Sequence, residues 1–178
     1  MIGQWLAASF LFAAGAAVAA PLTTIRSCRA DDGSRISLLA EPTIEGSRFY
    51  LQIDEQTTKA FTDMPEADFI GTIALAICAD HVLVFAISYG PPYLKGVAVR
   101  KNPLSHAIER IDFAEKALPR WLYLNPSRMQ LVIPNEGNEV PSKYLIYGLT
   151  AATAPKSEPG GGNSLPDTHG YKVLRLRK

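Results

Sequence analysis

The sequence predicts a mainly β protein, folded as a single antiparallel β-sandwich or small barrel to which one short helix is added. Short runs of β-branched and aromatic residues recur after residue 20, and clusters of Gly, Pro, Asn and Asp separate them. Two of these runs are apolar almost throughout, as in strands that are covered on both faces. We therefore expect one β domain over residues 20–150.

The first 19 residues are typical of a cleavable secretory signal peptide. Residues 5–19 carry no charge, are rich in Ala, and are fewer than the roughly 20 apolar residues that a membrane-spanning helix requires. Ala17 and Ala19 provide the small side chains of a cleavage site, so we expect a periplasmic or secreted product without an integral membrane segment. The competing interpretation is a buried amino-terminal helix.

The chain contains two cysteines, Cys28 and Cys78. In an exported protein, a disulfide bond between them is the default interpretation. Closing a loop of about 50 residues would stabilise the fold by roughly 4 kcal/mol through the entropy of the unfolded chain. The alternative is two separate buried thiols, because no Cys-x-x-Cys spacing indicates redox or zinc chemistry.

The first half of the domain begins with two expected strands, residues 23–29 and 35–39, joined by a turn at Asp31-Asp32-Gly33. Residues 49–54 alternate between apolar and polar side chains, which predicts a strand with one buried face. The apolar runs 69–78 and 82–87 are expected to be central strands. A single long helix over them is disfavoured, since Ile, Val, Thr and Phe dominate.

The second half contains four further expected strands, at residues 97–100, 121–124, 129–133 and 143–149. Residues 104–118 are ambiguous: their apolar side chains fall on one helical face between two prolines, but residues 111–113 also resemble the end of a strand. A helix is the preferred interpretation.

The strand at residues 121–124 contains the only tryptophan outside the leader. Trp121 and Tyr123 share one face of this strand, and the preferred arrangement places them in the core, with Arg120 and Leu122 pointing away. The reverse arrangement would expose the tryptophan.

The composition changes after residue 150. Residues 151–168 are rich in Pro and Gly and predict a linker, and residues 169–178 predict a basic tail or a last edge strand.

Several classes of function are disfavoured. The formal net charge of +1 disfavours a nucleic-acid-binding protein, which requires a concentrated basic face to contact phosphates. Neither Gly-x-Ser-x-Gly nor Ser-x-x-Lys occurs, and bridged cysteines leave no thiolate to act as a nucleophile. The histidines His81, His106 and His169 are too dispersed to predict a metal site. We expect no enzyme, no metal and no cofactor.

The most unusual segment is residues 88–96, with Tyr89, Pro91, Pro92, Tyr93 and Lys95 as candidate binding residues. Prolines stiffen such a loop, and tyrosines provide amphipathic contact area. The competing interpretation is a structural hairpin whose tyrosines cover the core.

The sequence therefore predicts an exported, non-enzymatic protein that binds a protein partner through rigid loops, such as an inhibitor or an immunity protein. One alternative is a structural or assembly accessory of the bacterial envelope or of a secretion system. Another is a hydrolase whose carboxylate pair only the fold would bring together.

Overall fold

The computed structural model describes residues 21–64, 70–137, 140–148 and 159–177. The expected signal peptide and residues 151–158 of the expected linker lie outside these ranges. All regular elements within the described ranges are strands. They are β1 (Thr23–Arg29), β2 (Arg35–Thr43), β3 (Gly46–Ile53), β4 (Gln56–Lys59), β5 (Thr72–Ala79), β6 (Val82–Ser88), β7 (Leu94–Lys101), β8 (Ile108–Glu115), β9 (Trp121–Asn125), β10 (Arg128–Pro134), β11 (Tyr144–Gly148), β12 (Gly160–Gly162) and β13 (Lys172–Arg175).

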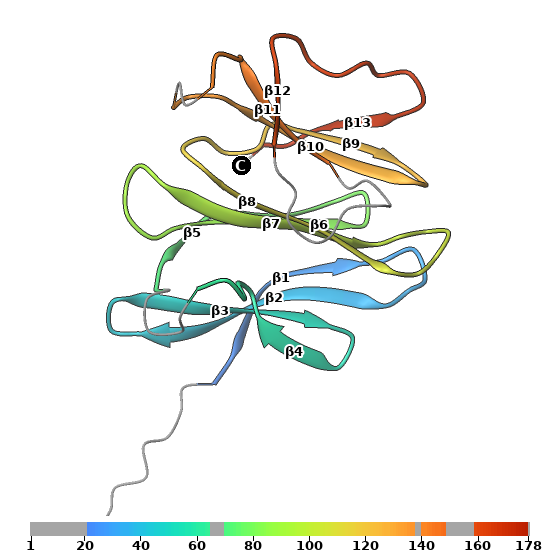
Figure 1. The fold of residues 1–178 in the computed structure, drawn as a ribbon. Coiled ribbons are helices and arrows are strands. Elements are labelled where there is room, and N and C mark those ends of the chain that lie inside the picture. Colours follow the sequence, from blue (N-terminus) through green and yellow to red (C-terminus); the bar gives the residue numbers. More distant parts are fainter. Residues whose placement is uncertain (1–20, 65–69, 138–139, 149–158, 178) are drawn as a thin grey trace, which may run out of the picture.

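The strands form three antiparallel sheets stacked in three layers (Figure 1). Sheet A has the order β1-β2-β3-β4 and sheet B the order β5-β6-β7-β8. Sheet C has the order β12-β11-β10-β9-β13, in which β13 returns to pair with β9. None of these sheets closes into a barrel, so the sandwich prediction is confirmed, with a third layer added. No helix that could cross a bilayer is found within the described ranges.

Sheet B lies between the other two sheets and is buried on both faces. In β6, the side chains of Val82, Val84 and Ala86 belong to the core shared with sheet C. Leu83 and Phe85 alternate with them and belong to the core shared with sheet A. This alternation explains why residues 82–87 are apolar without interruption.

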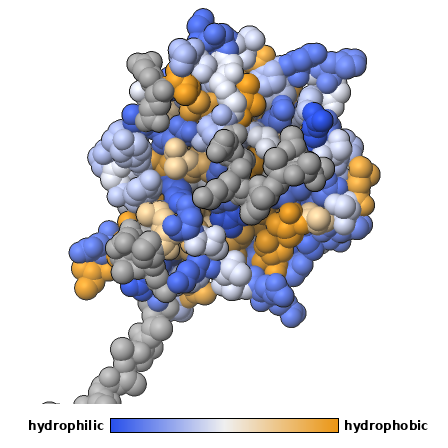
Figure 2. Space-filling model, in the orientation of Figure 1, coloured by the Kyte–Doolittle hydropathy of each residue, from blue (hydrophilic) through white to orange (hydrophobic). Residues whose placement is uncertain are grey.

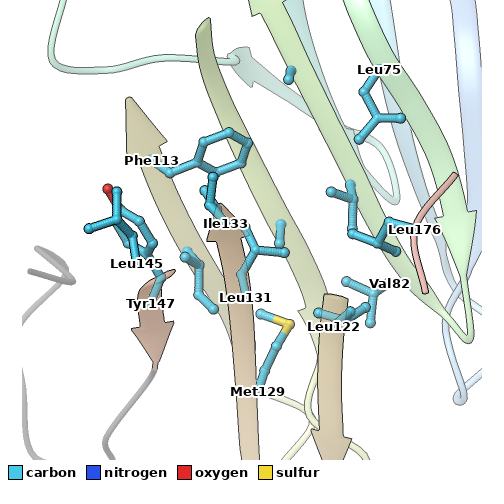
Figure 3. Close-up of a cluster of buried hydrophobic side chains, with 14 of the residues drawn as sticks. Leu75, Val82, Phe113, Leu122, Met129, Leu131, Ile133, Leu145, Tyr147 and Leu176 are labelled. Carbon is cyan, nitrogen blue, oxygen red and sulfur yellow. The ribbon is translucent and has the colours of Figure 1, made fainter. Parts of the chain in front are cut away.

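The core between sheets B and C is formed by side chains that point toward one another from both layers (Figure 3). Phe113 of sheet B packs near Tyr147 of sheet C, with 6.4 Å between their ring centroids. Each large apolar side chain buried in this way contributes about 1.5–3 kcal/mol.

The disulfide between Cys28 and Cys78 is confirmed, and it joins β1 of sheet A to β5 of sheet B. The prediction that residues 69–78 form a central strand is wrong in part, because β5 lies at the edge of sheet B. Close to the disulfide, Arg26 Nε donates a hydrogen bond to the Ala76 carbonyl oxygen at 3.1 Å. Both links hold the edges of sheets A and B together.

The prediction of a helix over residues 104–118 is wrong. This segment contains β8, which pairs with β7 along eight residues. Ile111 and Phe113 are buried and alternate with partly exposed Arg110 and Asp112. Leu104, which the helical pattern requires in the core, is 70% exposed. Two-residue periodicity therefore prevails, and the strand gains a complete hydrogen-bonded ladder with its neighbour.

The preferred orientation of Trp121 and Tyr123 is also wrong. Leu122 is fully buried in the core between sheets B and C, so its two neighbours lie on the outer face of sheet C. Tyr123 is nevertheless 1% exposed, and its ring meets that of Tyr171 edge to face at 6.0 Å. Trp121 is half-buried against Tyr144.

The carboxyl-terminal segment belongs to sheet C. Residues 160–162, in the range of the expected linker, form β12 on one edge of the sheet. Residues 172–175, in the range of the expected tail, form the edge strand β13. The chain from β12 to β13 passes over the outer side of sheet C (Figure 1), and Tyr171 within it helps to bury Tyr123.

Candidate functional site

Because neighbouring strands run in opposite directions, the connections collect at two ends of the stack, to the right and left in Figure 1. We define the latch end as the turns at residues 30–34, 54–55, 80–81, 102–107 and 126–127. We define the loop end as residues 44–45, 89–93, 116–120, 135–137 and 176. Two pairings, Ser47 with Gly71 and Thr72 with Ser88, place the β2–β3 turn and the β6–β7 loop at the same end.

At the latch end, charged side chains link the turns of different sheets. His81 Nδ1 donates a hydrogen bond to the Arg29 carbonyl oxygen at 2.8 Å, and its Nε2 lies 3.3 Å from Asp31 Oδ1. On the other side of the same turn, Lys172 of sheet C pairs with Asp80. The β5–β6 turn is thereby attached to both outer sheets.

A second set of charged contacts joins sheet B to the turns of sheet A. Lys101 Nζ lies 2.9 Å from Asp54 Oδ2 and 3.1 Å from Asp32 Oδ2. These hydrogen bonds raise the pKa of Lys101. Hydrogen bonds from the Ser34 hydroxyl and amide, with a smaller contribution from Lys101, lower the pKa of Asp32 to about 2.

The latch end also has a hollow of about 300 Å³ between the sheets. Four of its polar lining residues contact one another in pairs: His81 with Asp31, and Lys172 with Asp80. Arg100 bonds to Glu109 and donates to the Asn125 carbonyl oxygen at 3.0 Å. This arrangement suits the attachment of three sheets to one another.

At the loop end, residues 89–93 of the predicted binding segment form the β6–β7 loop, and residues 94–96, including Lys95, belong to β7. Pro91 and Pro92 are exposed at its tip. Tyr93 is 47% exposed, and Lys116 Nζ lies over its ring at 5.5 Å from the centroid. Cation–π contact with Lys116 therefore holds an accessible aromatic ring in position.

Tyr89 faces inward at the other side of the same loop. It is half-buried and packs against the core between sheets A and B. Burial raises the pKa of its hydroxyl, and the nearby charge of Asp63 adds to this effect. Tyr89 therefore anchors the loop, and Tyr93 is its exposed aromatic side chain.

Lys95 lies apart from the exposed residues of the loop. It is buried between sheets A and B, is paired with Asp63, and has its ammonium group 5.6 Å from the Phe61 ring centroid. Asp63 and the Phe61 ring therefore stabilise the buried ammonium group of Lys95.

Beside the Tyr93 loop, a hollow of about 380 Å³ opens between sheets B and C. It is named here the B–C hollow, and its lining residues are Leu75, Leu94, Lys116, Ala117, Leu118, Pro119, Arg120, Glu136 and Leu176. The sequence did not indicate this site, because its residues come from separate segments of the chain. The only local signal is the mixed apolar and basic stretch at residues 116–120.

The exposed apolar residues are scattered over the surface. Ile44 is fully exposed at the β2–β3 turn of the loop end, and Leu104 is exposed at the latch end. Figure 2 shows hydrophilic side chains over much of one face, with hydrophobic ones in separate groups. No group of three His, Cys, Asp or Glu side chains in the described ranges has the arrangement of a metal site.

Comparison with known proteins produced no match to a protein-family model, to a curated protein or to a solved structure. The protein is described by its own architecture, a three-layer antiparallel β-sandwich with one latched end and one loop end.

Proposed function

We propose that this chain is an exported, non-enzymatic binding protein of the inhibitor or immunity type, which recognises a protein partner through its loop end. The observation that carries the proposal is the exposed ring of Tyr93, which Lys116 holds beside the B–C hollow. Aromatic side chains in such settings often provide most of the binding energy of an interface.

The loop end is also stiff, which favours recognition. Pro91 and Pro92 restrict the backbone, Tyr93 N donates a hydrogen bond to the Gly90 carbonyl oxygen at 3.0 Å, and Tyr89 is anchored in the core. A surface that is ordered before binding loses less conformational entropy when the partner docks. The Cys28–Cys78 disulfide supports the exported compartment in this proposal.

The proposal is tested by affinity capture from an envelope extract, with the wild-type protein, Tyr93→Ala and Leu104→Ala. Leu104 is an exposed apolar residue at the latch end, so it is the matched control. We expect the wild type and the control to retain the same partner, and Tyr93→Ala to lose it while unfolding at the same urea concentration. Equal retention by all three proteins would remove Tyr93 and the loop end from the proposal.

A second candidate is an accessory of the envelope or of a secretion system that docks through its basic tail. Arg175 and Arg177 are exposed, and no carboxylate of the described ranges forms an ion pair with either. Removing the tail would be a poor test, because β13 pairs with β9 and Leu176 is buried in the core. Replacing Arg175 and Arg177 together by Ser tests it instead. This candidate requires partner capture from the envelope extract to be lost, and the inhibitor-type proposal requires the capture through Tyr93 to persist.

A further inference from the structure

We infer that Cys78 is a modification site: an external thiolate attacks its Sγ atom, forms a mixed disulfide there and releases Cys28 as a thiolate. The co-reactant is a thiol, either a small molecule such as glutathione or the reactive cysteine of a dithiol oxidoreductase. The inference concerns the disulfide between sheets A and B, and it does not depend on the proposed binding function.

The two cysteines differ in their exposure. Cys28 is 2% exposed and belongs to the core between sheets A and B. Cys78 is exposed, in the strand β5 at the edge of sheet B. Thiol–disulfide exchange requires the thiolate to reach one of the two sulfur atoms, so access selects the atom that is attacked. An attack on Cys28 would require a charged thiolate to enter the apolar core, which is unfavourable.

A cationic side chain lies close to the bond on the same edge. Arg26, two residues before Cys28 in β1, donates from Nε to the carbonyl oxygen of Ala76, two residues before Cys78 in β5, at 3.1 Å. Arg26 is exposed, and no carboxylate of the described ranges forms an ion pair with it. Its charge therefore attracts an approaching thiolate and stabilises the thiolate that leaves.

The exchange is balanced with thiols alone. The attacking thiolate bonds to Cys78 Sγ, the Sγ–Sγ bond breaks, and its electron pair leaves with Cys28. A second thiolate then attacks the sulfur of the first and releases Cys78, and water supplies the protons that both cysteines take up. The two protein cysteines are reduced and the two thiols are oxidised to a disulfide. The reverse sequence forms the bond from the reduced cysteines.

The modification would act on the contact between two sheets. The bond joins β1 to β5, whereas the core between sheets A and B holds the same two sheets through apolar side chains. Opening the bond is therefore expected to loosen one edge of the sandwich and to leave the domain folded.

The test treats the disulfide-bonded protein with glutathione, stops the reaction early with N-ethylmaleimide and locates both groups by peptide mass spectrometry. We expect glutathione on Cys78 and maleimide on Cys28, in roughly tenfold excess over the reverse arrangement, at a rate proportional to the glutathione concentration. Arg26→Glu should react about fivefold more slowly than the wild type, and added salt should reduce this difference. Arg177→Glu, which makes the same charge change at an exposed arginine of sheet C, should react at the wild-type rate.

Equal adducts on both cysteines, an excess on Cys28, or a rate independent of glutathione concentration would overturn the inference, the last because the bond would then open only after unfolding. Equal rates for Arg26→Glu and Arg177→Glu would refute the role of Arg26. A Cys-x-x-Cys oxidoreductase whose second cysteine is replaced by Ser identifies the source of the thiol. Its adduct at Cys78 supports a protein dithiol, and a glutathione adduct alone supports a small thiol. Tyr93→Ala should be modified at the wild-type rate, so failure of the binding proposal is distinguished from failure of this inference.

Discussion

Lys95 is paired with Asp63 across the interface between sheets A and B, with 8% of the lysine side chain and 65% of the aspartate side chain exposed. The buried partner depends on the exposed one, because a buried ammonium group without a counter-charge is unfavourable. Burial of the Asp63 carboxyl raises its pKa, but the hydrogen bond and the charge of Lys95 together outweigh this effect and hold the pKa below its ordinary value.

Asp63→Asn is expected to lower the free energy of unfolding by about 1–2 kcal/mol, less than for a fully buried pair because water reaches Asp63. Lys95→Met in the same background should recover part of the loss, since it removes the stranded charge and places an apolar side chain near the Phe61 ring in place of the ammonium group. Urea unfolding of the three proteins measures both effects. If Asp63→Asn alone were as stable as the wild type, Lys95 would not need Asp63 as its counter-charge.

Acid should act on the latch end through Asp32. Its pKa is lowered to about 2 by the hydrogen bonds from Ser34 and by Lys101, so its contribution to stability is fully present above the ordinary value of 3.8 and is lost as the pH falls toward 2. Carbon-detected NMR titration of the side-chain carboxyls checks this directly. Ser34→Ala should move the pKa of Asp32 back toward its ordinary value, and an unchanged titration in that variant would contradict the assignment.

Gly96→Ala is expected to destabilise the protein by about 1–3 kcal/mol through overpacking. A Cβ atom at residue 96 would lie 2.2 Å from Phe113 Cζ and 2.3 Å from the Phe85 carbonyl oxygen, so a neighbouring strand would have to move. Gly148→Ala is the matched control in β11, because its nearest contact is Gln130 Cγ at 3.6 Å. Thermal unfolding of both variants decides the matter, and equal midpoints would exclude the steric explanation.

Loss of the disulfide should destabilise the fold without abolishing its β content. Cys28→Ser combined with Cys78→Ser releases a constraint between residues 50 positions apart, which is worth about 2–4 kcal/mol. Far-ultraviolet circular dichroism should remain that of a β protein, while urea unfolding shifts to lower concentration. Thiol titration of the unreduced wild type should find no reactive sulfur, and two titratable thiols would show that the bond does not form in solution.

The strands that the sequence indicated best are those whose pattern follows from local burial. β1 has the expected bounds, and β6 is apolar from Val82 to Ile87 because two sheets cover it. β4 was not predicted, since its residues Gln56–Lys59 are all exposed and carry no apolar alternation. Its strand conformation follows from pairing with β3.

Of the candidate site, the exposed aromatic loop could be predicted, but its surroundings could not. Tyr93 stands out locally beside two prolines. Its contact with Lys116 depends on the stacking of segments that are distant in the chain. The burial of Lys95 and the lining of the B–C hollow depend on the same stacking.

The sequence by itself determined the β class, most strand positions and the pairing of Cys28 with Cys78, because alternation, turn residues and cysteine number are local or countable properties. Only the tertiary structure decided that residues 104–118 contain a strand, that Leu122 rather than Trp121 faces sheet B, and that three sheets leave a hollow at one end. The physical reason is that the local pattern of apolar residues is compatible with more than one conformation or orientation. The neighbour that buries each side chain, and so selects among them, comes from another part of the chain.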